Sequence, residues 1–386
     1  MKSKPWMGLS RCGGIGDNLM AAALLPALAD KYQVDLLTND VDATAVFENN
    51  PFISKLTKVK DDDIPKDSMP AWQGWFAKRA REYEKFVNLS HSCETLVALP
   101  QSQTAFYWPD EWRRKHCAAN YLDAIAEICG VEPDFGEPLF YPTEEEWKKA
   151  AETKAKVGHR VIGWSVAGSR LDKYHPRSPM IVGRLIHELG LPVIMFGAGG
   201  REASVVKATQ EHLEKTYGTL NGLHEARTCY EADEKTVAND KDGKSIHWPV
   251  RRSLTQLLTC DLVITPDTGL LWAAGFEDMP KIALLSHATP ENITKYFKNT
   301  VALHAARERV SCFPCHRLHD TIEFCHANKA GDGAACIADI SVEMVLDTAR
   351  TLLEMPSGLE ALEQRLKGNI TIHPGSFAAP ALRNVA

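Results

Sequence analysis

The feature that most constrains this 386-residue chain occurs twice: a short apolar strand, a glycine-rich turn and a helix of small residues. The first copy passes through the turn at 13–16 into the apolar run 19–28, and the pattern restarts with an apolar strand at 160–165. Strands that alternate with helices predict parallel sheets, because a crossover helix links neighbouring parallel strands. We therefore predict an α/β protein with two Rossmann-like domains, whose ligands bind at the carboxyl ends of the strands in a central cleft.

A change in composition marks the boundary between the two halves. Prolines and glycines are concentrated at 132–142, and a helix rich in Glu and Lys follows. We predict an N-terminal domain over 1–150, a C-terminal domain over 158–350, and a C-terminal helix and tail over 351–386. The polar insertion at 221–248 carries no assignment.

Composition and charge exclude several classes of protein. Hydrophobic residues make up 44% and charged residues 24% of the chain, which is typical of a soluble globular protein. The formal charge of −6 gives no general attraction to nucleic acid, although it allows a local basic groove. The chain contains no run of apolar residues long enough for a transmembrane helix or a signal peptide, so we expect a cytoplasmic protein.

The glycine-rich turn of the first half ends in a carboxylate, Asp17. Gly14 and Gly16 let backbone amides approach a ligand, and the N-terminus of the following helix favours an anion. A carboxylate at the mouth of a cleft can remove the proton of an incoming hydroxyl. The alternative is that Asp17 only caps its helix. As a dinucleotide motif the turn is weak, because Leu19 occupies the third glycine position of G-x-G-x-x-G.

The loop after the strand at 160–165 combines small residues, hydroxyls and two cations. This composition suits a diphosphate, because hydroxyl and amide groups such as those of Ser169 donate to its oxygens and Lys173 or Arg170 balances its charge. We expect Pro176 to start the next helix. An ordinary basic loop is the alternative.

A third polar turn follows the strand predicted at 261–265. Asp267 is placed to cap the next helix, and Thr268 and Gly269 are placed to present amides to a phosphate or a sugar. Capping and ligand binding are compatible in this turn.

Four of the ten cysteines are clustered in one segment, at Cys312, Cys315, Cys325 and Cys336. Four thiolates suit a tetrahedral zinc site, or an iron site. Such a closed site has no free coordination position, so the predicted metal is structural. Further candidate ligands are His316, His319 and His326. A reversible redox pair is an alternative, and the Cys-x-x-Cys-His spelling of c-type haem attachment requires export, which we do not expect.

Two stretches combine tryptophans with basic residues, at 72–81 and 106–115. We interpret both as amphipathic surface helices whose tryptophans face the core. The alternative is an acceptor-binding lip that offers stacking surfaces and cations.

The order of these motifs resembles the family 9 glycosyltransferases, which include the ADP-heptose–lipopolysaccharide heptosyltransferases and relatives that modify autotransporter proteins. The family has an N-terminal Gly-Asp before a Leu-Pro-Ala-Leu helix, a Ser/Thr-rich loop with a lysine and a proline, an Asp-[Ser/Thr]-Gly turn and, in many members, a Cys-x-Pro-Cys segment. The matching segments are Gly16-Asp17, 25–28, 169–176, 267–269 and 312–336. The resemblance spans residues 8–350.

The resemblance implies a GT-B architecture and an inverting, metal-independent sugar transfer, with ADP-heptose as the expected donor. It assigns Asp17 as general base, Lys173 with Ser169 to the departing diphosphate, and 267–269 to the sugar and phosphate site. The expected partners are a nucleotide-sugar donor and an acceptor glycan or protein. Modified DNA is a further alternative acceptor, against which the acidic net charge argues, and a homo-oligomer is an open alternative.

The chain departs from the family at two places. Trp272 stands where the family usually has histidine, and 286–290 reads Ser-His-Ala-Thr-Pro where the family more often has Phe-Gly-Pro-Thr. Two other functional classes stay open. One is an NAD-dependent oxidoreductase, against which the incomplete glycine motif and the missing acidic ribose ligand argue; the other is a non-catalytic, metal-stapled GT-B scaffold.

Overall fold

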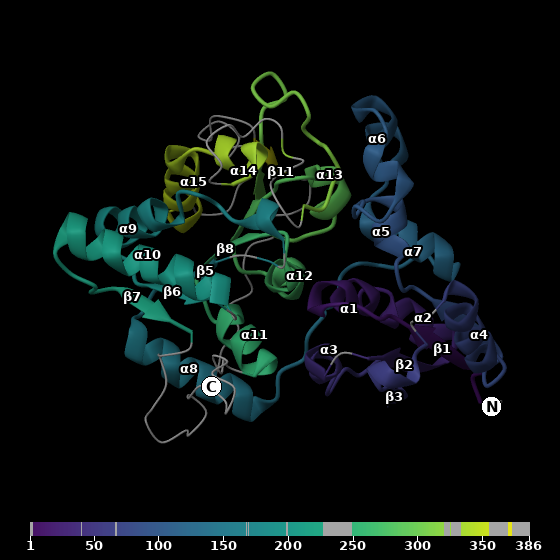
Figure 1. Ribbon diagram of the computed structural model, residues 1–386. Helices are drawn as coiled ribbons and strands as arrows, with labels where there is room; N and C mark the ends of the chain where they lie inside the picture. Colours follow the sequence, from purple (N-terminus) through teal and green to yellow (C-terminus); the bar gives the residue numbers. More distant parts are fainter. Residues whose placement is uncertain are drawn as a thin grey trace.

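The computed structural model describes residues 3–39, 41–65, 68–166, 168, 170–197, 200–226, 249–319, 325, 333–354 and 370–372. Within them the chain forms two α/β domains, each built on its own sheet and joined by a linker that leads into a long helix (Figure 1). No helix in these ranges is long and apolar enough to cross a membrane.

The N-terminal domain contains a four-stranded parallel sheet of order β3-β2-β1-β4. Its strands are β1 (Trp6–Ser10), β2 (Gln33–Thr38), β3 (Lys55–Lys58) and β4 (Lys85–Asn88). Its helices are α1 (Ile15–Ala22), α2 (Leu25–Lys31), α3 (Val41–Val46), α4 (Met69–Ala80), α5 (Ser92–Leu96), α6 (Asp110–His116) and α7 (Tyr121–Cys129), with short 3₁₀ turns η1 (Asp61–Asp63) and η2 (Thr104–Tyr107). The central strand β1 is buried from Met7 onward, as expected for a strand covered on both faces.

The C-terminal domain contains a seven-stranded sheet of order β11-β10-β9-β8-β5-β6-β7. Its strands are β5 (Ile162–Ser165), β6 (Val193–Phe196), β7 (Leu223–Glu225), β8 (Leu262–Pro266), β9 (Lys281–Leu284), β10 (Thr300–Leu303) and β11 (Ile370–Ile372). Its helices are α8 (Glu144–Val157), η3 (Leu171–Lys173), α9 (Ser178–Leu189), α10 (Gly200–Tyr217), α11 (Val250–Leu258), α12 (Gly269–Gly275), α13 (Pro290–Ile293), α14 (Ala335–Asp339) and α15 (Val342–Glu354). All neighbouring strands are parallel except β10 and β11.

The two domains are in contact along an extended interface. Helix α1 packs against α12, and the largest cluster of buried apolar side chains includes residues of both helices (Figure 1). Asn292 donates to the carbonyl oxygens of Cys117 and Ala119, at 2.9 and 2.8 Å. Arg251 donates to the carbonyl oxygens of Ala45 and Glu48, each at 3.0 Å. These bonds hold the carboxyl ends of the two sheets toward each other.

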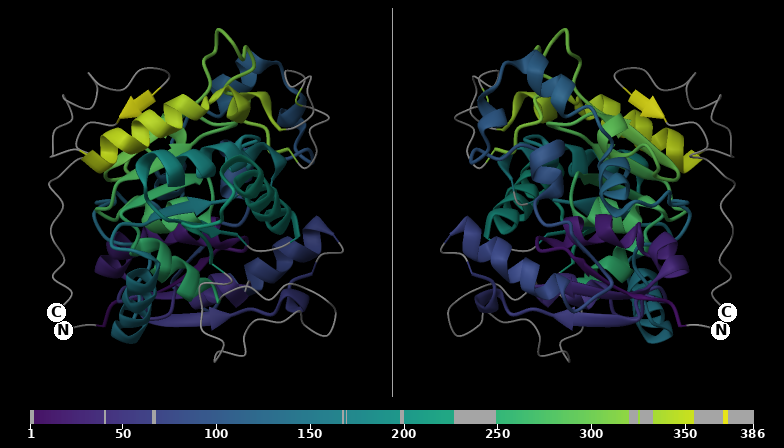
Figure 2. Two further views of the ribbon diagram at one scale, coloured as in Figure 1. Left: turned by 90° about the vertical axis from the view of Figure 1, so that its left-hand side faces the viewer. Right: turned by 90° about the vertical axis from the view of Figure 1, so that its right-hand side faces the viewer.

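The cysteine segment forms a second bridge between the domains. The backbone at Leu99 pairs with that at His316 and Leu318, at 2.8 and 2.9 Å. The buried Arg113 of α6 donates to the carbonyl oxygen of Cys315 at 2.8 Å. In Figure 2 the blue α6 accordingly lies at the end of the molecule opposite the purple and violet strands β1 and β2 of its own domain, level with the C-terminal domain.

Several details differ from the expectations. Pro176 lies two residues before α9, which begins at Ser178. Trp112 is 65% exposed instead of facing the core, because α6 contributes its arginine to the interior in place of this tryptophan. The segment predicted as helix and tail also supplies strand β11. Of the helix and tail predicted over 351–386, residues 355–369 and 373–386 lie outside the described residues, and so do residues 227–248 of the polar insertion.

Candidate active site

Four loops converge where the parallel strands end. Asp17 follows β1, Lys173 follows β5, Asp267 follows β8 and His287 follows β9. Side chains from these loops line one cavity of about 620 Å³ between the two domains. Convergence at this edge is the usual ligand position in doubly wound α/β domains.

The cavity gathers every described residue that the sequence predicted for substrate binding and catalysis. Its walls include Gly14, Gly16, Asp17, Arg170, Lys173, Asp267, Thr268 and Gly269. Ser169, the remaining predicted residue, lies outside the described part of the chain. The carboxylate of one domain and the cationic loop of the other therefore face a common space.

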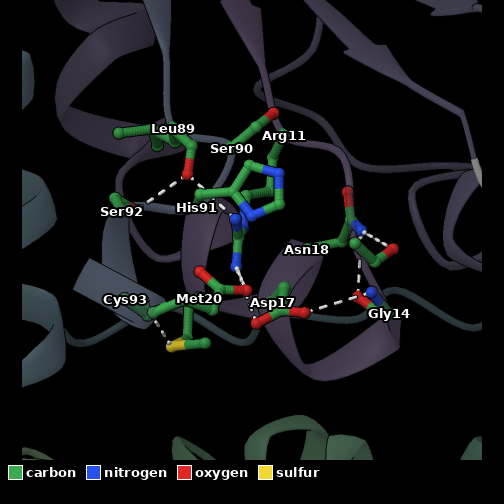
Figure 3. A network of polar contacts seen from close by, with 12 residues as sticks. Arg11, Gly14, Asp17, Asn18, Met20, Leu89, Ser90, His91, Ser92 and Cys93 are labelled. Carbon is green, nitrogen blue, oxygen red and sulfur yellow. Dashed lines mark hydrogen bonds and ion pairs between the residues drawn. The ribbon is translucent and has the colours of Figure 1, made fainter. Parts of the chain in front are cut away.

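Asp17 caps its helix and also faces the cavity. It occupies the third position of α1, where the Gly14 amide donates to its Oδ2 at 3.1 Å. Its other oxygen, Oδ1, is 2.7 Å from the Arg11 guanidinium (Figure 3). Because a carboxylate oxygen has two acceptor sites, these bonds leave Asp17 able to accept a further hydrogen bond.

Arg11 is a site residue that the sequence reasoning missed. It is 1% exposed, donates to the Leu89 carbonyl oxygen at 2.9 Å, and contacts Glu94 at 3.4 Å as well as Asp17. Burial opposes its charge, but Asp17 and then Glu94 outweigh that effect and raise the pKa of Arg11 above its ordinary value. Its position directly after β1, at the ligand edge of the sheet, was the available signal.

Lys173 and Asp267 form an ion pair across two loops of the C-terminal domain. Lys173 Nζ is 3.1 Å from Asp267 Oδ2, and Trp272 Nε1 donates to Oδ1 at 3.1 Å. Burial alone would raise the pKa of Asp267, but Lys173 outweighs burial and lowers it. The carboxylate is thus held ionised with a defined orientation.

This geometry corrects the predicted role of Asp267 as a helix cap. The N-cap of α12 is Thr268, whose side chain makes no capping bond and instead lies 3.1 Å from the hydroxyl of Thr265. Asp267 binds Lys173 and Trp272 because both offer stronger donors within reach than the helix amides. Trp272, the position where the resembling family has histidine, therefore orients Asp267.

The glycines at the interface allow α1 and α12 to approach closely. A Cβ atom added to Gly269 would lie 2.9 Å from Ile15 Cγ2 and 3.2 Å from the Gly16 nitrogen, too close for an ordinary contact. A side chain at this position would push the domains apart. Gly269 thus has a packing function in addition to its place on the cavity wall.

A buried Asp–His pair separates this cavity from a smaller one. Asp172 Oδ2 is 3.1 Å from His287 Nδ1 and accepts from Ser286 Oγ at 3.0 Å, while Oδ1 accepts from the His319 amide at 3.2 Å. Burial raises the pKa of Asp172, but the bond from His287 and the nearby positive groups lower it to about 2. His287 lines both cavities. The sequence reasoning did not single out this pair, because the two residues meet only in the folded chain.

All four clustered cysteines line the smaller cavity, which has a volume of about 320 Å³. Cys315 Sγ is 3.9 Å from His319 Nε2, and Cys325 Sγ accepts from the Ala335 amide at 3.4 Å. Across the described ranges, however, no three His, Cys, Asp or Glu side chains are grouped as a ready set of metal ligands. The thiols share one space with a donor set suited to a soft metal, without a preformed tetrahedral arrangement. Of the candidate histidines, His316 is buried and His326 falls outside the described residues.

The two sheets, their relative placement and the cavity between them define a GT-B fold. Three solved glycosyltransferase structures are similar along most of their length. The family 9 glycosyl transferase from Veillonella parvula is 16% identical, with a TM-score of 0.59, and the match covers 92% of this chain and 98% of that one. The E. coli ADP-heptose lipopolysaccharide heptosyltransferase II is 13% identical, with a TM-score of 0.55 and coverage of 90% and 98%.

The third structure is the dodecameric iron-containing heptosyltransferase TibC in complex with ADP-D-beta-D-heptose. TibC comes from enterotoxigenic E. coli. It is 14% identical to this chain, with a TM-score of 0.52 and coverage of 92% and 80%. No protein-family profile and no curated protein sequence matches the chain. The predicted α/β fold with parallel sheets is confirmed, and it is the fold of these glycosyltransferases.

Proposed function

We propose that the protein is an inverting glycosyltransferase that moves a sugar from a nucleoside-diphosphate donor to an acceptor hydroxyl. The observation that carries this proposal is the shared cavity, in which Asp17 of one domain faces Lys173 and Asp267 of the other. The similarity in fold to sugar transferases supports it. The volume, about 620 Å³, is within the range of small-molecule sites.

The reaction assigns a distinct task to each wall. The acceptor oxygen attacks the anomeric carbon of the sugar, the bond from that carbon to the diphosphate oxygen breaks, and its electron pair leaves with the diphosphate. Asp17 takes the proton of the attacking hydroxyl. Lys173 and Arg170 face the departing diphosphate, whose charge increases in the transition state, and stabilise it electrostatically. Attack from the face opposite the leaving group inverts the anomeric centre.

Donor and acceptor are proposed at the level that the resemblance supports. ADP-heptose is the expected donor, and the names of the similar E. coli proteins are consistent with it. The acceptor is a hydroxyl of a glycan or a protein. Titration with ADP, UDP, GDP and their sugars tests the donor; preferential binding of the adenine nucleotides is expected, and preference for another base would replace ADP-heptose in the proposal.

Removal of the proposed base is the direct test of sugar transfer. With labelled donor and a panel of acceptors, Asp17→Asn should lower transfer by roughly 10²–10⁴-fold, the usual contribution of a general base. Binding of the nucleoside diphosphate should persist. Asp30→Asn, on the exposed end of α2, is the matched control and should leave transfer unchanged. Full transfer by the Asp17 variant would contradict the assignment.

We also propose that Cys312, Cys315, Cys325 and Cys336 hold a structural metal, zinc or iron, after a small rearrangement of their shared cavity. Their chemistry and common location support this, as does the iron-containing description of TibC. The metal would connect the chain segments that carry these cysteines, and no chemical step of the transfer passes through it.

Metal content of the purified protein tests the proposed site. A stoichiometric metal is expected in the wild-type protein, and its loss in Cys315→Ser and Cys336→Ser. Cys129→Ser, a buried cysteine of α7, is the matched control and should retain the metal. Metal-free wild-type protein that folds normally would refute the site.

A further inference from the structure

The N-terminal wall of the larger cavity carries two carboxylates bound by one cation. Arg11 Nη2 lies 2.7 Å from Asp17 Oδ1 and 3.4 Å from Glu94 Oε1. Both carboxylates line the cavity. The second oxygen of Glu94, Oε2, is buried and has no hydrogen-bond partner among the residues that the structure describes. Glu94 is therefore held loosely, at the longer of the two distances, and has unused acceptor capacity.

Two other titratable groups on this wall, Cys93 and Tyr121, are neutral in the physiological pH range. Burial raises the pKa of Cys93 to about 12. Burial also raises the pKa of Tyr121 well above its ordinary value. The charged or titratable groups that face the cavity from the opposite domain are Arg170, Lys173, Glu202, Asp267 and His287. On the N-terminal side, the electrostatic environment of Asp17 is set by Arg11 and Glu94.

Proton uptake by Asp17 changes the pairing of Arg11. When Asp17 does take the acceptor proton, Arg11 loses its nearest counter-ion while it remains 1% exposed, and a buried unpaired charge is costly. A second carboxylate on the same guanidinium lowers this cost, because Glu94 can remain as the counter-ion of Arg11.

We propose that Glu94 is a positioning residue for the proposed transfer: it shares Arg11 with Asp17 and becomes the main partner of Arg11 when Asp17 is protonated. This rests on the proposed function of Asp17. The step is balanced, since the proton passes from the acceptor hydroxyl to Asp17 and no charge leaves the Arg11–Glu94 pair. The unpartnered Oε2 and the 3.4 Å contact are the features of the resting state that allow Glu94 to draw closer.

The test compares Glu94→Gln with wild type in a pH profile of kcat. The amide keeps the size of the side chain and removes its charge, so Asp17 becomes a weaker base. We expect kcat at neutral pH to fall roughly tenfold and the acid limb of the profile to move lower, because protonated Asp17 would leave Arg11 without a counter-ion. Glu94→Asp restores the charge and should recover part of both losses, which a merely structural contact would not produce.

Two controls separate this inference from its alternatives. Glu82→Gln removes a carboxylate paired with Arg79 on the exposed side of the same domain and should change neither kcat nor the profile. Melting temperature and nucleoside-diphosphate binding should match wild type in Glu94→Gln. An unchanged profile and kcat would overturn the inference, as would a variant as inactive as Asp17→Asn, which would make Glu94 the base. Retained transfer in Asp17→Asn would instead refute the proposed function itself.

Discussion

The two cavities are adjacent and yet differ in the groups that line them. The larger one is bordered by both domains and presents charged side chains that are already paired, as in Arg11–Asp17 and Lys173–Asp267. The smaller one is lined by four thiols and two histidines, together with Asp110, Asp172 and Arg317. Paired charges around open volume suit a polar ligand, whereas buried thiols around a small volume suit an ion. His287 lines both cavities and is bonded to Asp172, so this pair forms part of the wall between them.

We expect the largest loss of stability when Asp172 is removed from this wall. Asp172→Ala removes the common acceptor of His287, Ser286 and the His319 amide and leaves these donors buried without it. We expect the free energy of unfolding to fall by about 3–5 kcal/mol. Chemical denaturation measures it, with the exposed Asp347→Asn on α15 as control. A loss of stability no larger than that of the control would show that the contacts of Asp172 do not stabilise the wall between the two cavities.

The next effect concerns the larger cavity alone. Lys173→Ala removes the cation that we propose faces the leaving diphosphate, and we expect kcat to fall by about 10²–10³-fold. The smaller cavity should be unaffected, so any bound metal should remain. Lys207→Ala, on the exposed face of α10, should behave as wild type. Unchanged kcat in the Lys173 variant would place the diphosphate elsewhere.

Acid should lower the free energy of unfolding through His175. His175 bonds to the Ile340 carbonyl oxygen at 2.9 Å and thereby ties the loop after η3 to α14, which carries Cys336. Burial lowers the pKa of His175 from 6.5 to about 4, so the unfolded chain binds more protons between these values. Stability from this group is complete above pH 6.5 and falls by about 3 kcal/mol as the pH drops to 4.

Denaturation of wild type and His175→Gln at several pH values measures this effect. The variant should lose less stability between pH 6.5 and 4 than wild type does. Equal acid dependence in the two proteins would show that another group controls it.

We expect the smallest change from a substitution that tests how Trp272 orients Asp267. Trp272→Phe keeps an aromatic ring beside Tyr121 and removes the bond to Asp267. A lost hydrogen bond to a charged group predicts destabilisation by about 1–2 kcal/mol and weaker nucleoside-diphosphate binding. The exposed Trp112→Phe is the control. Unaltered nucleoside-diphosphate binding in the Trp272 variant would show that ligand affinity does not depend on the bond that orients Asp267.

Much of this organisation follows from local pattern. The apolar runs at β1, β5, β8 and β9 predicted the strands, and parallel order placed their following loops at one edge. Asp17, Lys173 and Asp267 were recognised because each follows such a strand. Glu94 and the Asp172–His287 pair were missed, because their partners are distant in the sequence. Arg11 was missed although it directly follows β1. The place of Trp112 and β11 also depended on tertiary contacts rather than on local propensity.

We propose that residues of both domains act on one bond in the larger cavity. A crystal structure of the protein with bound nucleoside diphosphate tests it most directly. We expect the terminal phosphate beside Lys173 and Arg170, with open space between that phosphate and Asp17 for the sugar and the acceptor. A nucleotide bound with its phosphates away from Lys173, or on a surface that Asp17 does not face, would contradict it.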